Sequence, residues 1–312
     1  MNVWNRIATV LVASVGIASL AQAQSSPKAT IYRLDAGSTL VEGCFDPCLC
    51  PLFFADNLRG TFSLRRVFTQ DPLFDQTYVI SDVNWLSDVG GTERRISGNG
   101  MFRYTTAAAG NLQEMVLQLS IDGEEPVEFN SGLVPGGAGD LFPSIDIAID
   151  MNDQVCFDTV LGIQASPVPK DEISRFGVGG SSSFISGCFD PCLCPVVFLS
   201  DVRGSFDLVP LTNPASGIGE WALVNVDLQL PSLTPGLPNE ATGAGILAIN
   251  LTQNGVRQRV RMTLTKDAIT DEFDSGLLPG PAGPPTALTT SVNTNNLVCF
   301  DTVYAIEARI LN

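Results

Sequence analysis

Apolar and polar residues alternate along several short stretches of the chain, a pattern typical of β-strands with one buried face. Met115, Leu117 and Leu119 share one face of such a stretch. In residues 256–264 the apolar residues also share a face, and three arginines point the opposite way. No helical periodicity longer than two turns follows the N-terminal segment, so we predict an all-β protein. Strands are expected at 77–86, 100–105, 115–121, 145–151 and 155–165.

The sequence contains one set of motifs twice. The segment Gly-Cys-Phe-Asp-Pro-Cys-Leu-Cys-Pro occurs at 43–51 and again, unchanged, at 187–195, which is 187 − 43 = 144 positions later. Arg-Gly-(Thr/Ser)-Phe, Phe-(Asn/Asp)-Ser-Gly-Leu and Val-Cys-Phe-Asp-Thr-Val recur in the same order. Solenoid repeats have periods of about 20–50 residues. The much longer period here predicts two copies of a whole domain.

Short strands separated by glycine and proline are typical of a β-sandwich or a small β-barrel, and the pattern leaves both open. We expect one such domain at 28–166 and a second at 176–312. Residues 167–175 would form a linker, which two prolines near its start would make extended and semi-rigid. The predicted fold is therefore two tandem copies of one antiparallel β-sandwich or small β-barrel domain.

Residues 1–23 are predicted to be a signal peptide that is removed on export. Arg6 supplies the positive charge, residues 7–20 are apolar, and the Ala-Gln-Ala sequence at 21–23 suits a cleavage site. The apolar stretch is shorter than the ~20 residues of a membrane-spanning helix. We expect a secreted or periplasmic mature chain without a transmembrane segment, beginning at Gln24.

The eight cysteines are divided equally between the two copies and all lie in repeated motifs. In an exported protein an even number of matching cysteines predicts disulfides, and a zinc site of four thiolates is the alternative. We expect two disulfides in each copy and no bound cofactor or metal. The cysteines concerned are Cys44, Cys48, Cys50, Cys156, Cys188, Cys192, Cys194 and Cys299.

Four cysteines in one copy allow three pairings. One requires a Cys48–Cys50 bridge, which an extended chain disfavours. The Asp-Pro sequence at 46–47 suits a turn that folds Cys44 back toward Cys48. We therefore favour Cys44–Cys48 with Cys50–Cys156, while Cys44–Cys50 with Cys48–Cys156 stays open. In the second copy the favoured pairs are Cys188–Cys192 and Cys194–Cys299.

Composition excludes several classes of protein. The chain has 17 basic and 33 acidic residues, a formal net charge of −16 and no histidine. Such an acidic chain lacks the basic clusters that bind nucleic acid. Without histidine, Ser-His-Asp and Cys-His catalysis and most zinc sites are excluded. Hydrophobic residues make up 45% of the chain, which is enough for packed cores.

Two aspartates recur at fixed positions in each copy: Asp46 and Asp158 in the first, Asp190 and Asp301 in the second. A glycosidase needs a pair of carboxylates. However, an aspartate before proline commonly caps a turn, and one in a strand can pair with an arginine. We therefore expect no catalytic residues and no enzyme activity.

Arg59 and Arg203 are the only cations within the repeated motifs. An arginine that recurs in a fixed place implies a fixed partner, either an anionic ligand or a repeated aspartate. A carboxylate left unpaired near a buried disulfide would be costly. We therefore predict structural ion pairs of Arg59 with Asp158 or Asp46, and of Arg203 with Asp301 or Asp190.

Three motifs of the first copy resemble strands of the YceI-like periplasmic barrels: Tyr-Arg-Leu-Asp-Ala-Gly-Ser at 32–38, Leu-Arg-Gly-Thr-Phe at 58–62 and Ile-Ser-Gly-Asn-Gly-Met-Phe at 96–102. Those proteins bind polyisoprenoid lipids inside a lipocalin-like barrel. The chain departs from them in its added cysteines, its shorter domains and the lack of the family's early histidine. The resemblance implies a small apolar ligand in each domain.

Two functions follow from these observations. The first is a non-catalytic exported protein that acts as a structural or interaction component of the cell envelope or extracellular layer, in contact with a protein or polymer. The alternative is a periplasmic binder of lipid or small apolar ligands. A solid core would favour the first function, and a large apolar cavity would favour the second.

Overall fold

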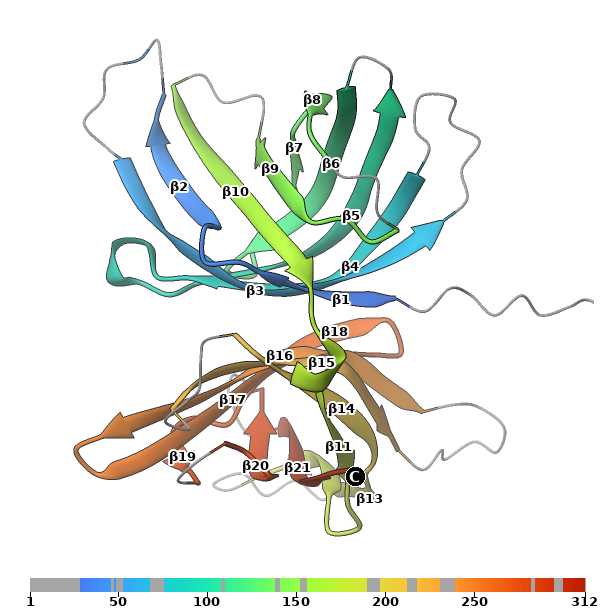
Figure 1. Ribbon diagram of the computed structural model, residues 1–312. Coiled ribbons are helices and arrows are strands. Elements are labelled where there is room, and N and C mark those ends of the chain that lie inside the picture. Colours follow the sequence, from blue (N-terminus) through green and yellow to red (C-terminus); the bar gives the residue numbers. More distant parts are fainter. Residues whose placement is uncertain are drawn as a thin grey trace, which may run out of the picture.

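The computed structural model describes residues 29–45, 48, 53–67, 76–107, 110–137, 141–151, 156–189, 197–211, 218–230, 239–281, 284–294 and 300–311, so the predicted signal peptide lies outside it. Two antiparallel sheets are stacked one above the other, and the chain passes between them once (Figure 1). Within these ranges the helical elements are two short turns, η1 (Val89–Gly91) and η2 (Lys170–Glu172). Neither turn is long enough to cross a bilayer.

The first sheet closes into a barrel of eight strands. Its elements are β1 (Thr30–Leu34), β2 (Thr39–Cys44), β3 (Phe53–Val67), β4 (Gln76–Ser87), β5 (Arg94–Ala107), β6 (Gly110–Ile121), β7 (Val127–Asn130), β8 (Val134–Pro135), β9 (Ile145–Asp150) and β10 (Phe157–Pro167). Strands β2 to β7 pair in succession, β7 pairs with β9, β9 with β10, and β10 pairs back onto β2. Strand β1 pairs with both β3 and β10.

The second sheet is also antiparallel. Its elements are β11 (Ser174–Val178), β12 (Ser183–Cys188), β13 (Val197–Asp201), β14 (Arg203–Pro210), β15 (Gly219–Gln229), β16 (Glu240–Thr252), β17 (Gly255–Lys266), β18 (Ile269–Asp274), β19 (Leu278–Pro279), β20 (Ala287–Asn293) and β21 (Phe300–Ile310). Strands β14 to β18 pair in succession and continue through β20 and β21 to β12 and β13. Strand β11 pairs with both β14 and β21.

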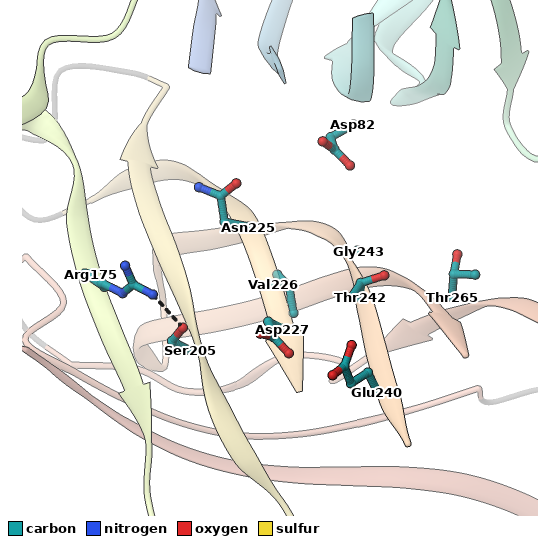
Figure 2. Close-up of a pocket in the computed structure, with 10 residues that line it drawn as sticks. All are labelled: Asp82, Arg175, Ser205, Asn225, Val226, Asp227, Glu240, Thr242, Gly243 and Thr265. Atoms are coloured by element: carbon teal, nitrogen blue, oxygen red, sulfur yellow. Dashed lines mark hydrogen bonds between the residues drawn. The ribbon is translucent and has the colours of Figure 1, made fainter. Parts of the chain in front are cut away.

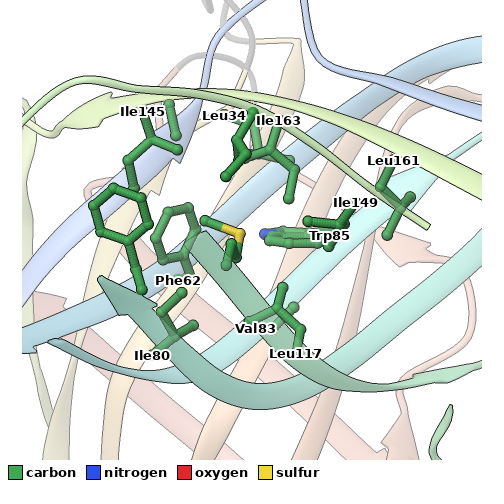
Figure 3. Packing of buried hydrophobic residues seen from close by; sticks show 14 of the residues in the cluster. Leu34, Phe62, Ile80, Val83, Trp85, Leu117, Ile145, Ile149, Leu161 and Ile163 are labelled. Atoms are coloured by element: carbon green, nitrogen blue, oxygen red, sulfur yellow. The ribbon is translucent and has the colours of Figure 1, made fainter. Parts of the chain in front are cut away.

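Interlocked aromatic side chains fill the interior of the first barrel. Trp85 is 1% exposed and lies among the buried residues of the cluster (Figure 3). Its ring meets that of Phe62 edge-on at 6.0 Å between centroids, and Phe62 stacks on Tyr32 at 5.3 Å. The rings of Tyr78 and Phe102 are tilted against each other, with centroids 6.1 Å apart. Aromatic pairs in offset or edge-on geometry stabilise the folded state by more than their buried area alone would predict.

The repeated Arg-Gly-(Thr/Ser)-Phe motif of β3 and β14 lies opposite a bulge in the neighbouring strand, β4 or β15, which has one extra residue there. Gly60 and Gly204 have φ of 146° and 144°, and a Cβ at either position would lie 2.2 Å or 1.9 Å from a carbonyl oxygen of the neighbouring strand. Only glycine permits such a close approach. The register shifts at the phenylalanine two residues after each glycine, and Phe62 and Phe206 point into the cores. The motif is thus explained by backbone geometry and packing.

The five strands predicted from alternation are confirmed as β4, β5, β6, β9 and β10. Met115, Leu117 and Leu119 are buried, as their shared face required. Of the two architectures left open, the first sheet is a barrel. Residues 167–175, expected as a linker, contain the end of β10, the turn η2 and the start of β11.

Candidate functional site

The two sheets meet at an apolar contact to which both contribute. On β4, Trp85 points into the barrel, so its neighbour Leu86 points outward, because adjacent residues on a strand face opposite sides. Leu86 is 1% exposed because the second sheet covers it. The buried residues of this contact, the intersheet cluster, are Ile31, Leu86, Val168, Val209, Ala222, Val224 and Ile246.

Polar contacts surround the intersheet cluster. The guanidinium of Arg59 on β3 donates to Glu220 on β15, with Nη2 and Oε1 3.0 Å apart. Nη2 of Arg261 on β17 lies 2.8 Å from Oε2 of Glu93. Asn84 on β4 donates to the backbone oxygen of Gly245, 2.7 Å away. A further ion pair joins Arg95 to Glu272 at 2.8 Å.

These pairs shift the pKa of their members. Burial alone would lower the pKa of Arg59, but the hydrogen bonds and charges of Glu220 and Asp88 raise it above its ordinary value. The hydrogen bond from Arg261 lowers the pKa of Glu93 against the opposing effect of burial. Both groups are therefore held in their charged forms at neutral pH.

Arg59 does not pair with Asp158, so that prediction is wrong. Asp158 lies opposite Gly43 on β2, and Gly43 lies opposite Phe53 on β3. Asp158 is thus level with Phe53, six residues from Arg59, or about 20 Å along the strand at ~3.3 Å per residue. Arg59 instead contacts Glu220 and Asp88, and Asp158 accepts a hydrogen bond from the backbone of Thr159 at 2.7 Å.

Arg203 does not pair with Asp301 either. Arg203 is exposed and forms no ion pair with an acid in the part of the chain that the structure describes. Asp301 accepts hydrogen bonds from the backbone of Thr294 and Thr302, at 3.2 and 2.7 Å. The other proposed partners, Asp46 and Asp190, lie outside the described residues.

The disulfide in the first sheet joins Cys48 to Cys156, with Cα atoms 5.1 Å apart. The favoured pairs Cys44–Cys48 and Cys50–Cys156 are therefore wrong. A hydrogen bond from the amide of Cys48 to the oxygen of Phe45 closes a turn that begins at Phe45, one residue before the expected start at position 46. Because the amide of Phe45 also binds the oxygen of Cys156, this turn carries Cys48 beside Cys156.

Among the remaining cysteines, Cys44 and Cys188 are disulfide-bonded as well. The other cysteines named in the prediction lie outside the described residues, and the pairs expected for the second copy with them. They are Cys50, Cys192, Cys194 and Cys299.

A polar cleft of about 460 Å³ lies beside the intersheet cluster (Figure 2). Asp82 faces it from the first sheet, and the second sheet contributes Asp227 and Glu240. One carboxylate oxygen of Asp227 is buried without a hydrogen-bond partner, while Arg175 donates to Ser205 at 3.2 Å. Such a lining suits hydroxyl or ammonium groups, which donate hydrogen bonds to carboxylates.

Two indirect signals of this interface were present in the sequence. Three arginines, including Arg261, were seen to share the outward face of one predicted strand, and an outward row of charge needs solvent or a partner. Arg59 was identified through its repeated motif. Glu93 and Glu220 were missed because neither lies in a repeated motif and each pairs with a residue more than 150 positions away.

We expect Arg59→Ala to lower the free energy of unfolding by about 1.5–3 kcal/mol, since it removes hydrogen bonds between charged groups that are about four-fifths buried. Arg203→Ala is the matched control, because it changes the same position of the repeated motif where the side chain is exposed. That variant should change stability by less than about 0.5 kcal/mol. Equal losses in the two urea titrations would contradict the assigned pairing.

Lowering the pH should weaken the interface, because it protonates Glu93. A carboxylate with a lowered pKa in the folded state adds stability above its unfolded pKa, here about 4.5, and this stability is lost as the pH falls through the lowered value. Glu93→Gln should therefore melt below wild type at neutral pH, and the difference should vanish in acid. A difference that stays constant across this range would show that the Arg261 pair does not depend on the charge of Glu93.

The comparisons with known proteins add no relative: no family model, no curated protein and no solved structure matches the chain.

Proposed function

We propose that the protein is an exported, non-catalytic component of the cell envelope or extracellular layer. In this proposal two tandem copies of one disulfide-stapled β domain form a structural unit that contacts a protein or a polymer. The observation that carries the proposal is the packed aromatic interior of the first barrel, which holds Trp85, Phe62 and Tyr32 at 1% exposure or less. Such a domain offers its outer surface to partners.

Strand pairing supports the idea of two copies. Tyr32 lies opposite Phe62, and Phe176 lies opposite Phe206, in strands that follow one another at the offset of the sequence motifs. Both ring pairs are stacked at 5.3 Å between centroids. The first strand of each sheet also pairs with two others, β1 with β3 and β10, and β11 with β14 and β21.

The contact between the sheets supports a structural role. The intersheet cluster removes apolar surface from water, and each fully buried aliphatic side chain contributes about 1.5–3 kcal/mol. The ion pairs of Arg59 and Arg261 lie at its margin. An apolar contact framed by polar pairs is the usual anatomy of a specific interface.

Native mass spectrometry of the protein from its source organism tests this proposal. We expect a processed chain that begins at Gln24, is recovered from the envelope or medium, and carries no lipid. Cross-linking before extraction should attach it to an envelope protein or polymer. A chain that retains its first 23 residues in the cytoplasm, or a bound lipid of several hundred daltons, would overturn the proposal.

A further inference from the structure

A cavity of about 190 Å³ enters the second sheet between β12, β17, β18 and β21. Its floor is apolar, because Phe184, Leu264, Phe273 and Tyr304 are all at least 93% buried. Its rim is polar or exposed and consists of Ser186, Lys266, Asp267, Ile269, Asp271 and Thr302. A buried apolar floor with a few polar groups around it is the usual anatomy of a small-molecule site.

A weak seam in the sheet gives access to this cavity. Among the described residues, strands β18 and β20 share one residue pair, Asp274 with Asn293, and the rest of β18 is hydrogen-bonded to β17. The side chains of β18 therefore border an opening toward β21 and β12.

The first barrel has the same seam, but ion pairs span the corresponding place. Strands β7 and β9 also share one residue pair. There the guanidinium of Arg94 bridges Glu42 and Asp122, at 2.9 and 2.8 Å. Because Glu42 and Asp122 lie on β2 and just after β6, Arg94 ties these two strands together.

The second sheet lacks this bridge. Glu42 lies opposite Thr159, and its equivalent Ser186 lies opposite Thr302, so serine replaces the glutamate. Gly98 of β5 and Gly243 of β16 occupy equivalent places in the two sheets, opposite Val83 and Val226. Four residues earlier, Arg94 in the first barrel corresponds to Asn239 in the second sheet. An Arg94-type bridge therefore cannot form across the second seam.

Tyr304 gives the cavity a specific polar group. Leu161 occupies the equivalent position in the first barrel, so the hydroxyl is particular to the second sheet. The ring is 98% buried and packs on Phe184 and Phe273, with centroids 5.0 and 5.1 Å away. The hydroxyl forms no hydrogen bond with any residue that the structure describes.

The hydroxyl is a hydrogen-bond donor at neutral pH. Burial, with the negative charges of Asp271 and Asp267, raises the pKa of Tyr304 above its ordinary value. The hydroxyl oxygen itself is not fully buried, and no described residue accepts its hydrogen bond, so it can donate to an acceptor atom of a ligand in the cavity.

We propose that the second sheet binds a small aromatic carbonyl compound, whose ring lies on the floor and whose oxygen accepts a hydrogen bond from Tyr304. Three aromatic side chains at the floor favour an aromatic ring in edge-on or offset contact. The cavity volume of about 190 Å³ restricts the ligand to a small molecule such as a single substituted ring. The site does not depend on export or on an envelope partner.

The test is a ¹⁹F NMR titration of the mature protein with 4-fluoroacetophenone, compared with 4-fluoroethylbenzene, which lacks the oxygen. We expect the ketone to bind about tenfold more tightly, which corresponds to one hydrogen bond of about 1.4 kcal/mol. Equal affinity of the two compounds for the wild-type protein, or no binding of the ketone up to its solubility, would overturn the proposal.

Variants assign the site. Tyr304→Phe should weaken ketone binding to the level of the fluoroethylbenzene, and Tyr78→Phe, a matched loss of a hydroxyl in the first barrel, should leave it unchanged. The double variant Ser186→Glu/Asn239→Arg, which restores the residues of the first barrel's bridge, should abolish binding. If Tyr304→Phe retains full affinity while its circular dichroism matches wild type, the assignment is wrong.

Discussion

Replacing both Cys48 and Cys156 by alanine lowers the free energy of unfolding by about 4–5 kcal/mol in our account. The disulfide joins residues 108 positions apart, and the chain-entropy model gives about 4.7 kcal/mol for a loop near 100 residues. Changing both cysteines leaves no new free thiol. The measurement is urea unfolding under non-reducing conditions, followed by circular dichroism.

A second double variant separates the effect of losing the crosslink from the effect of backbone strain at position 156. Cys156 has a φ of 86°, a left-handed conformation that glycine adopts readily and alanine does not. Cys48→Ala/Cys156→Gly should therefore be more stable than the double alanine variant by about 1 kcal/mol. A loss below about 1 kcal/mol in the double alanine variant would mean that the crosslink does not hold β10 against the rest of the barrel.

Trp85→Ala should destabilise the first barrel by about 3–5 kcal/mol, because it leaves a large cavity in a packed core. The indole is 1% exposed and contacts Phe62 edge-on. Leu251→Ala is the control, since that side chain is 67% exposed on β16 and should change stability by less than about 0.5 kcal/mol.

The same variant distinguishes a packed interior from a ligand cavity. If a large apolar ligand filled the barrel, removal of Trp85 would enlarge its site and could raise ligand affinity with little loss of stability. Chemical unfolding of wild type and variant, each extracted with organic solvent beforehand, decides between these outcomes. A loss of less than about 1 kcal/mol would contradict the packed interior.

Local patterns predicted the strands because burial of one strand face leaves a period of two in the sequence. Met115, Leu117 and Leu119 show this directly. Closure of the first sheet could not be predicted in the same way. It depends on β10 pairing with both β2 and β9, and alternation contains no information about which strands become neighbours.

The two wrong pairings have physical reasons that the sequence does not display. Arg59 was matched to an acid within its own copy, whereas its partner Glu220 lies across the intersheet contact. The cysteine pairing depended on the local turn, and the turn closed between Phe45 and Cys48 places Cys48 instead of Cys50 beside Cys156. Repetition identified Arg59 and the cysteines as structural residues but left their partners open.

The central claim is that the two sheets are docked through the intersheet cluster into one structural unit. Its most direct test is small-angle X-ray scattering of the protein at low and high salt. Salt screens ion pairs but not the apolar contact of Leu86 and Val224. We predict one compact particle whose radius of gyration is the same in both conditions and increases in Val224→Asp. Two independently moving domains in the wild-type protein, with a radius of gyration that grows with salt, would contradict the account.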